Sequence, residues 1–130
     1  MQQTHNTKKI PNVRLAEPVL MSAQGKKLGR LASTVAHLLM GKQSALYERH
    51  IPRGAKVLVT DAAKLDIRLA ERSKKYHKRY SGYPGGLRLT PFPEVVAKKG
   101  MRELIRHAVY GMLPANRLRN MRMKNLTIRE

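Results

Sequence analysis

The sequence contains no cysteine and no tryptophan, only one phenylalanine, and no long apolar run. Without cysteine, a disulfide framework and thiolate zinc sites are excluded, which fits a reducing compartment. A spanning helix would need about 18 or more consecutive apolar residues, and no such run occurs. No basic amphipathic helix with aromatic anchors occurs either, so a membrane is not the expected partner.

Acidic residues are also scarce. The chain has 27 Lys and Arg against 8 Asp and Glu, a formal charge of +19 on 130 residues. Such an excess destabilises a compact state in isolation and attracts polyanions, among which a nucleic acid is favoured. The length favours one domain with a modest core, and no repeat or low-complexity linker divides it.

The positive charge is densest between Arg72 and Arg88, which read RSKKYHKRYSGYPGGLR, and no carboxylate occurs between Glu71 and Glu94. Lys and Arg can hold phosphates, and the three interleaved tyrosines can stack on unpaired bases. The turn residues of GYPGG follow. This pattern predicts a strand that runs into a rigid basic loop, with an ordinary exposed basic hairpin as the alternative.

The first half of the chain predicts a strand, a helix and a second strand. Residues 1–14 are poorly apolar and form an expected N-terminal extension to a single domain over residues 15–130. Pro18–Ser22 fits a buried first strand, and Lys26–Met40 has the apolar spacing of a helix that ends at Gly41. Lys56–Thr60 fits a central strand covered on both faces, which implies a parallel crossover.

The second half predicts mostly helices. Ala62–Glu71 is ambiguous with a strand-like alternation, and Ser73–Ser81 is expected to be extended. Pro93 suits the first turn of a helix that leaves through Lys98, Lys99 and Gly100. A second helix should run from Met101 to Met112. A third, short helix after Pro114 is expected to pack through Leu118 and Met121 and to spread its cations around its other sides.

Catalytic and metal-binding patterns are weak. The turn from Gly25 to Arg30 resembles a phosphate-binding turn but matches neither G-x-x-x-x-G-K-S/T nor G-x-G-x-x-G, although a helix N-terminus after a strand can hold a phosphate. A plain strand-to-helix turn remains the alternative. The five histidines are scattered without a carboxylate partner, so no metal site, no cofactor and no enzymatic activity are predicted. His77 is interpreted as a stacking or hydrogen-bonding residue.

Three long motifs resemble those of the large-subunit ribosomal protein thirteen family of bacteria or organelles. They are GKKLGRLASTVAHLLMGK at 25–42, KYHKRYSGYPGGL at 75–87 and AVYGMLPANRL at 108–118. The resemblance implies a three-layer α/β/α single domain on a mostly parallel four-stranded sheet. It also implies a structural component of the large ribosomal subunit, in the cytoplasm or in an organelle, that binds large-subunit ribosomal RNA early in assembly.

The residues expected to face RNA combine this resemblance with the basic stretches. They are Lys26, Lys27, Arg30, Lys42, Lys74, Lys75, His77, Lys78, Arg79, Tyr80, Ser81, Tyr83, Arg88, Arg117, Arg119, Arg122 and Lys124. Neighbouring large-subunit proteins are further expected partners, and no small-molecule substrate is expected.

The chain also departs from the family pattern. Asp61 stands where the family usually has asparagine, Tyr80 where it has histidine, and Arg119 where it has glycine. Two other classes remain open from the sequence. One is a nucleic-acid-binding protein that acts outside the ribosome, and the other is a small α/β enzyme with a nucleotide at the Gly25 turn.

Overall fold

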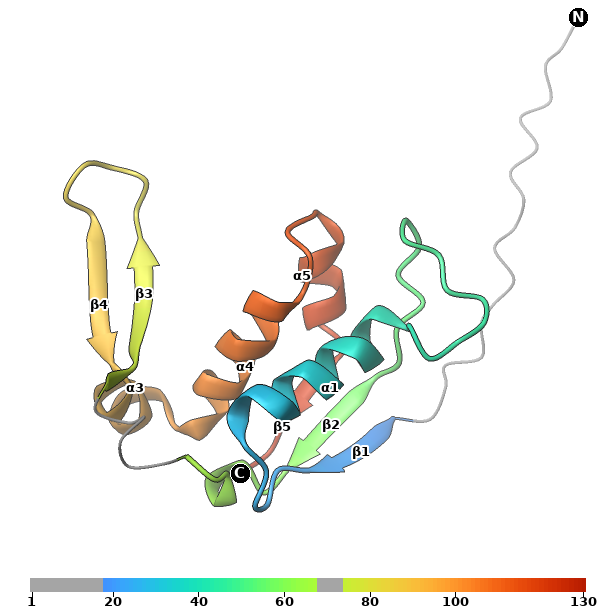
Figure 1. The fold of residues 1–130 in the computed structure, drawn as a ribbon, viewed down its shortest axis with the longest axis horizontal. Helices are drawn as coiled ribbons and strands as arrows, with labels where there is room; N and C mark the ends of the chain where they lie inside the picture. The colour runs from blue at the N-terminus through green and yellow to red at the C-terminus, as the bar shows by residue number, and fades with distance from the viewer. Residues whose placement is uncertain (1–17, 68–73) are drawn as a thin grey trace, which may run out of the picture.

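The computed structural model describes residues 18–67 and 74–130, and it shows a single α/β domain from which a β-hairpin projects (Figure 1). The expected extension at 1–14, and part of the ambiguous segment before the hairpin, lie outside the described residues. Within them, no helix has the length and apolar content needed to cross a membrane.

The sheet contains β1 (Val19–Ser22), β2 (Val57–Thr60) and β5 (Leu126–Ile128) in the order β1-β2-β5, with both pairs parallel. α1 (Leu28–Met40) connects β1 to β2, so the predicted parallel crossover is confirmed. The described sheet has three strands instead of four, because the remaining strands, β3 and β4, pair only with each other.

One face of the sheet carries the core. In parallel strands, residues in register share a face, so Val19, Val57 and Leu126 lie on the same side. Val57 and Val59 are 1% and 0% exposed, whereas Leu20, on the opposite face of β1, is 70% exposed. On the central strand β2, Leu58 and Thr60 of the opposite face are half-buried, so the expectation that this strand is covered on both faces holds only in part.

α1 is amphipathic and buries a broad face that contacts both β2 and α4. It begins two residues later than predicted. Gly25 has a φ of +66°, Lys27 is extended, and the backbone N–H of Asp66 donates to the Lys26 carbonyl oxygen at 3.1 Å. This bridge keeps the chain extended until Leu28, and Gly41 ends the helix where the sequence predicts.

Asp61 follows β2 with a φ of +56°, a left-handed conformation that asparagine and aspartate tolerate better than most residues. The Lys64 ammonium lies 3.0 Å from the Asp61 carboxylate. This hydrogen bond, with the charge of Lys64, lowers the pKa of Asp61. The aspartate therefore fits the left-handed turn, and a 3₁₀ helix over Ala62–Lys64 follows.

The C-terminal helices match their predicted bounds closely. α3 (Phe92–Lys99) has Pro93 in its first turn, and α4 (Met101–Met112) ends before Leu113 and Pro114. α5 (Leu118–Met123) is the predicted short helix, but its buried side is different. Met121 is 51% exposed and Arg122 is 1% exposed, so the expectation that Met121 packs inward is wrong.

Gly54 is required by a close approach of two backbones. A Cβ at Gly54 would overlap the carbonyl carbon and oxygen of Leu39, in the last turn of α1, and neither group can move aside cheaply. A Cβ at Gly29, in the first turn of the same helix, would meet no atom within 4 Å. Gly29 can therefore serve as the control for a substitution at Gly54.

We expect Gly54→Ala to lower the free energy of unfolding by about 1 to 3 kcal/mol, as overpacking does. Gly29→Ala should leave it unchanged or raise it by up to about 1 kcal/mol, because alanine is the better helix former. Chemical denaturation of both variants measures the difference. Equal stabilities would contradict the close packing of the Gly54 loop on α1.

Candidate nucleic-acid interface

The basic stretch forms an antiparallel hairpin of β3 (Tyr76–Tyr80) and β4 (Leu87–Pro91), drawn at the left of Figure 1. Both sequence-based readings hold in part, since a strand does enter a basic turn, and a second strand that was not predicted returns from it. Side chains alternate between the two faces of a strand. One face therefore carries Tyr76, Lys78, Tyr80, Leu87 and Leu89, and the other carries His77, Arg79, Arg88 and Thr90.

Arg79 and Arg88 lie directly opposite each other in the register of the hairpin. Like charges at opposed positions destabilise a sheet. Both side chains are exposed, and neither forms an ion pair with a carboxylate among residues 18–67 and 74–130. An anion placed between the two guanidinium groups would remove this repulsion.

The other face of the hairpin is apolar and aromatic, yet exposed. Tyr76, Tyr80, Leu87 and Leu89 are 50%, 62%, 57% and 51% exposed. Tyr83, at the tip, is 76% exposed. Tyr76 was not among the predicted site residues, although its spacing from Tyr80 places both rings on one face. These rings are available for stacking on bases.

The tip is a tight turn. Gly82 and Gly85 have φ values of +89° and +76°, which glycine adopts without strain. The backbone N–H of Gly86 donates to the Tyr83 carbonyl oxygen at 3.0 Å, and the Ser81 hydroxyl lies against the Gly86 Cα, where a Cβ would overlap it. Ser81 therefore supports the turn that presents Tyr83.

The base of the hairpin is attached to the helices. The Phe92 N–H, at the start of α3, donates to the Lys75 carbonyl oxygen at 3.2 Å. The ring of His77 lies 3.9 Å, centroid to centroid, from the ring of His107 on α4. Burial lowers the pKa of His107, the nearby His77 lowers it further, and Glu103 opposes the shift. His77 is therefore half-buried against α4.

A second basic cluster surrounds the turn before α1. Lys26, Lys27 and Arg30 line a cavity of about 330 Å³, together with Met21, Gly25, Leu31 and Thr34. The first turn of α1 contains no acidic residue and has no side-chain cap. Lys42 follows the other end of this helix, about 20 Å away at 1.5 Å per residue, and so belongs to a different part of the surface.

The cationic side chains after α4 differ in their exposure to solvent. Arg117 and Lys124 are exposed, whereas Arg122 is 1% exposed and its buried Nε has no hydrogen-bond partner among the described residues. In this conformation Arg122 does not reach the surface, so it is not positioned to contact RNA as predicted. The side chain packs inward because α5 rests on α1 through the side that carries it.

Arg119 holds the junction of α4 and α5. Its Nε and one Nη donate to the carbonyl oxygens of Pro114 and Leu113 at 3.2 and 3.0 Å, and its guanidinium lies 4.4 Å from the centre of the Tyr110 ring. These contacts satisfy carbonyl groups just beyond the C-terminus of α4. The structure thus gives Arg119 a role that no glycine at this position could have.

Two arginines outside the predicted set of site residues also lie on the surface. Arg102 and Arg106 are one turn apart on the exposed side of α4, and with Lys124 they line a cavity beside β5. Their spacing of four residues is the only sequence signal for them. The described residues contain no group of three His, Cys, Asp or Glu side chains able to hold a metal ion.

The arrangement is that of a basic α/β domain that presents paired cations and exposed tyrosine rings on a projecting hairpin. Comparison with known proteins identifies its family. Residues 16–130 match the family model of ribosomal protein L13. The chain is 41% identical over 109 residues to the large ribosomal subunit protein uL13 of Thermoanaerobacter sp. (strain X514), covering 84% of this chain and 76% of that protein.

A protein with the same description from Chlamydia caviae is 40% identical over 109 residues, which cover 84% of this chain and 72% of the relative. The chain therefore belongs to the ribosomal protein L13 family, as its motifs indicate. This family consists of structural proteins without enzymatic activity, which excludes the nucleotide-dependent enzyme left open by the sequence.

The contact between His77 and His107 predicts a dependence of stability on pH. Because the pKa of His107 is lower in the folded state, the unfolded state binds a proton more readily. The contribution of His107 is fully present above a pH of about 6.5 and is lost as the pH falls through the folded pKa. The wild-type melting temperature should therefore fall more between about pH 7.5 and 5.5 than that of His107→Gln. His37→Gln, which changes an exposed histidine of α1, is the control, and it should fall as the wild type does. Identical pH profiles for wild type and His107→Gln would contradict the assignment.

The contacts of Arg119 predict a loss of stability on its replacement. Arg119→Gln removes two hydrogen bonds from a cation to carbonyl oxygens, and we expect a loss of about 1 to 2 kcal/mol because the group is only partly buried. Arg117→Gln removes the same charge from an exposed side chain and should change stability by less than about 0.5 kcal/mol. Thermal melts without RNA measure both. Equal effects would mean that Arg119 does not hold the α4–α5 junction.

Proposed function

We propose that this protein is a structural component of the large ribosomal subunit that binds large-subunit ribosomal RNA and supports early subunit assembly. The observation that carries the proposal is the opposed pair of Arg79 and Arg88, two exposed cations without a carboxylate partner among the described residues. A backbone phosphate is the anion that a ribosomal RNA supplies.

The exposed rings support RNA more than a simple polyanion. Tyr76 and Tyr80 stand on the face of the hairpin opposite to the two arginines, and Tyr83 stands at its tip. Unpaired bases of folded RNA stack on such rings, while phosphates on either side meet cations. A hairpin inserted into a folded RNA would therefore use both faces at once.

The remaining cations extend this surface. Lys74, Lys75 and Lys78 belong to the same hairpin or its base, and Lys26, Lys27 and Arg30 form the separate cluster before α1. Lys42, Arg117 and Lys124 are further exposed contacts in the proposal. Arg119 and Arg122 are left out of it, since one is engaged with backbone carbonyls and the other is buried.

The relatives are described as large ribosomal subunit proteins, which supports this location for the chain and neighbouring large-subunit proteins as further partners. In a bacterial source the subunit would be cytoplasmic. The match over residues 16–130 supports one domain from residue 15 onward, with residues 1–14 as an extension.

The test separates binding from folding through a substitution with opposite effects on the two. Arg88→Glu places a carboxylate opposite Arg79, so the free protein should gain about 0.2 to 1 kcal/mol. Binding to large-subunit ribosomal RNA should weaken, and the slope of affinity against salt should fall by about 1.8, for two lost phosphate contacts at about 0.9 each. Lys56→Glu makes the same change of charge at an exposed residue away from the hairpin and should alter the slope less.

Filter-binding titrations at several salt concentrations measure the slope, and melting curves measure the stability. A wild-type salt slope for Arg88→Glu would refute the role of the hairpin. In the same assay, replacing Tyr80 and Tyr83 with alanine should cost about 1 to 3 kcal/mol of binding for each stacked base, with little change in slope. If this variant has a lower melting temperature but binds RNA as the wild type does, the two rings stabilise the fold and do not stack on bases.

A further inference from the structure

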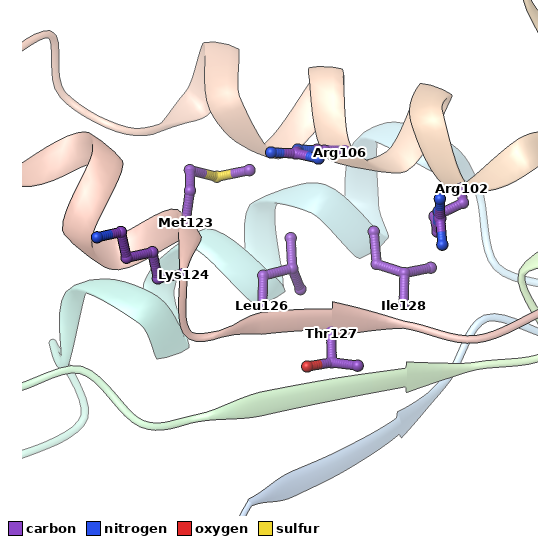
Figure 2. A pocket seen from close by; sticks show the side chains of 7 residues that line it. All are labelled: Arg102, Arg106, Met123, Lys124, Leu126, Thr127 and Ile128. Carbon is purple, nitrogen blue, oxygen red and sulfur yellow. The ribbon is translucent and has the colours of Figure 1, made fainter. Parts of the chain in front are cut away.

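A cavity of about 390 Å³ lies between α4 and β5, on the core side of the sheet (Figure 2). Arg102 and Arg106 reach it from α4, and Leu126 and Ile128 point toward it from β5. Met123 and Lys124, at the end of α5, complete its lining with Thr127. The slot therefore combines a small apolar floor, formed by Leu126 and Ile128, with three cations along its sides.

These three cations have no acidic partner in the part of the chain that the structure describes. Arg102, Arg106 and Lys124 are exposed and make no ion pair with any carboxylate in the described ranges, and no acidic side chain lines the cavity. The two nearest acidic residues along the chain interact with other groups. Glu103 raises the pKa of His107, and the Glu130 carboxylate lies against Gly100. The slot therefore attracts an anion.

The cavity also reaches the backbone edge of β5. The Asn125 carbonyl and the Arg129 N–H bond to β2, so alternation along the strand turns the backbone groups of Leu126 and Ile128 away from β2. Thr127 lines the cavity although its side chain points to the other side of the strand in Figure 2. The outer edge of β5 thus offers N–H and C=O groups beside the apolar floor.

We propose that this slot receives one unpaired nucleotide of the large-subunit ribosomal RNA. Its base lies on Leu126 and Ile128, with its polar edge at the backbone of β5, and its flanking phosphates bind Arg102, Arg106 and Lys124. The inference rests on the proposed function and adds a second site, on the helical body, to the hairpin. The volume falls in the range that encloses small ligands, and splayed bases are the usual targets of RNA-binding proteins.

An acidic peptide is the competing occupant, because a strand added to β5 would also find backbone partners and cations. β5 has only 3 residues, however, so an added strand would gain few main-chain hydrogen bonds. A base, in contrast, needs only one or two hydrogen bonds to the backbone of β5. The apolar floor, which would contribute little to aspartate or glutamate side chains, suits the flat face of a base.

The first experiment compares two variants of equal charge. Arg102→Gln with Arg106→Gln should weaken binding to large-subunit ribosomal RNA and lower the salt slope by about 1.4, at about 0.7 for each contact to an unpaired strand. Arg49→Gln with Lys99→Gln removes two exposed cations elsewhere and should have a smaller effect. Equal losses for the two variants would overturn the inference while leaving the hairpin test untouched. If Arg88→Glu and both double variants all retain wild-type binding, the proposed function fails instead.

A second experiment tests the base and keeps every charge. Leu126→Phe fills the slot and should weaken RNA binding about 5- to 150-fold, the range of one lost base contact, with an unchanged salt slope. A melting curve shows whether the variant folds. Independently of any variant, the methyl NMR signals of Leu126 and Ile128 in the wild type should shift with adenylate or uridylate pentanucleotides. Shifts with pentaglutamate alone would overturn the RNA assignment in favour of a peptide, and no shift with either probe would overturn it altogether.

Discussion

Uncompensated positive charge is the constraint on which the rest of this structure depends. With a formal charge of +19, the chain has far too few carboxylates to neutralise its surface. Those that form ion pairs do so within short segments, such as Glu94 with Lys98 on α3 and Asp61 with Lys64 after β2. Arg79 and Arg88 of the hairpin have no carboxylate partner among residues 18–67 and 74–130. A partner that binds only the folded state would stabilise that state by mass action, so the stability of the protein and its assembly are linked.

The core explains how such a chain folds at all. Its buried side chains come from α1, one face of the sheet, and the inner sides of α3 and α4, and the cations of these elements lie on the outside. Arg122 is the exception, a buried cation whose Nε has no partner in the described part of the chain. The apolar core and the cationic surface are therefore separated almost completely, which lets the body stay compact while the charges spread over the hairpin and helix ends.

The helices could be predicted from sequence because the helical spacing of their apolar residues agreed with the glycine and proline residues that bound them. Leu104, Ile105 and Val109 repeat at helical spacing between Gly100 and Pro114, and α4 has the predicted bounds. β4 and β5 could not be predicted, since Leu87–Pro91 is a largely exposed strand and Leu126–Ile128 is too short to show a period. On α5 the error was one position, about 100° around the helix, because methionine is normally the better core residue than arginine.

The cations of the candidate site were visible in the composition, but their geometry was not. That Arg79 opposes Arg88 depends on the register of the hairpin, and register is invisible when one of its strands is missed. Arg119 donates hydrogen bonds to the carbonyl oxygens of Leu113 and Pro114 because of the conformation of the chain between α4 and α5, which the sequence does not reveal. Arg102, Arg106 and Lys124 converge only because β5 returns beside α4, a long-range contact that no local pattern reports.

The attachment of the hairpin has a mechanical consequence. Five residues of strand extend about 17 Å, so the tip with Tyr83 stands at the end of a long arm anchored at its base. A rotation of about 10° at that base would move the tip by about 3 Å, roughly the length of a hydrogen bond. The ring contact between His77 and His107, together with the Phe92 bond to Lys75, therefore sets the angular precision with which the distant tyrosine is aimed.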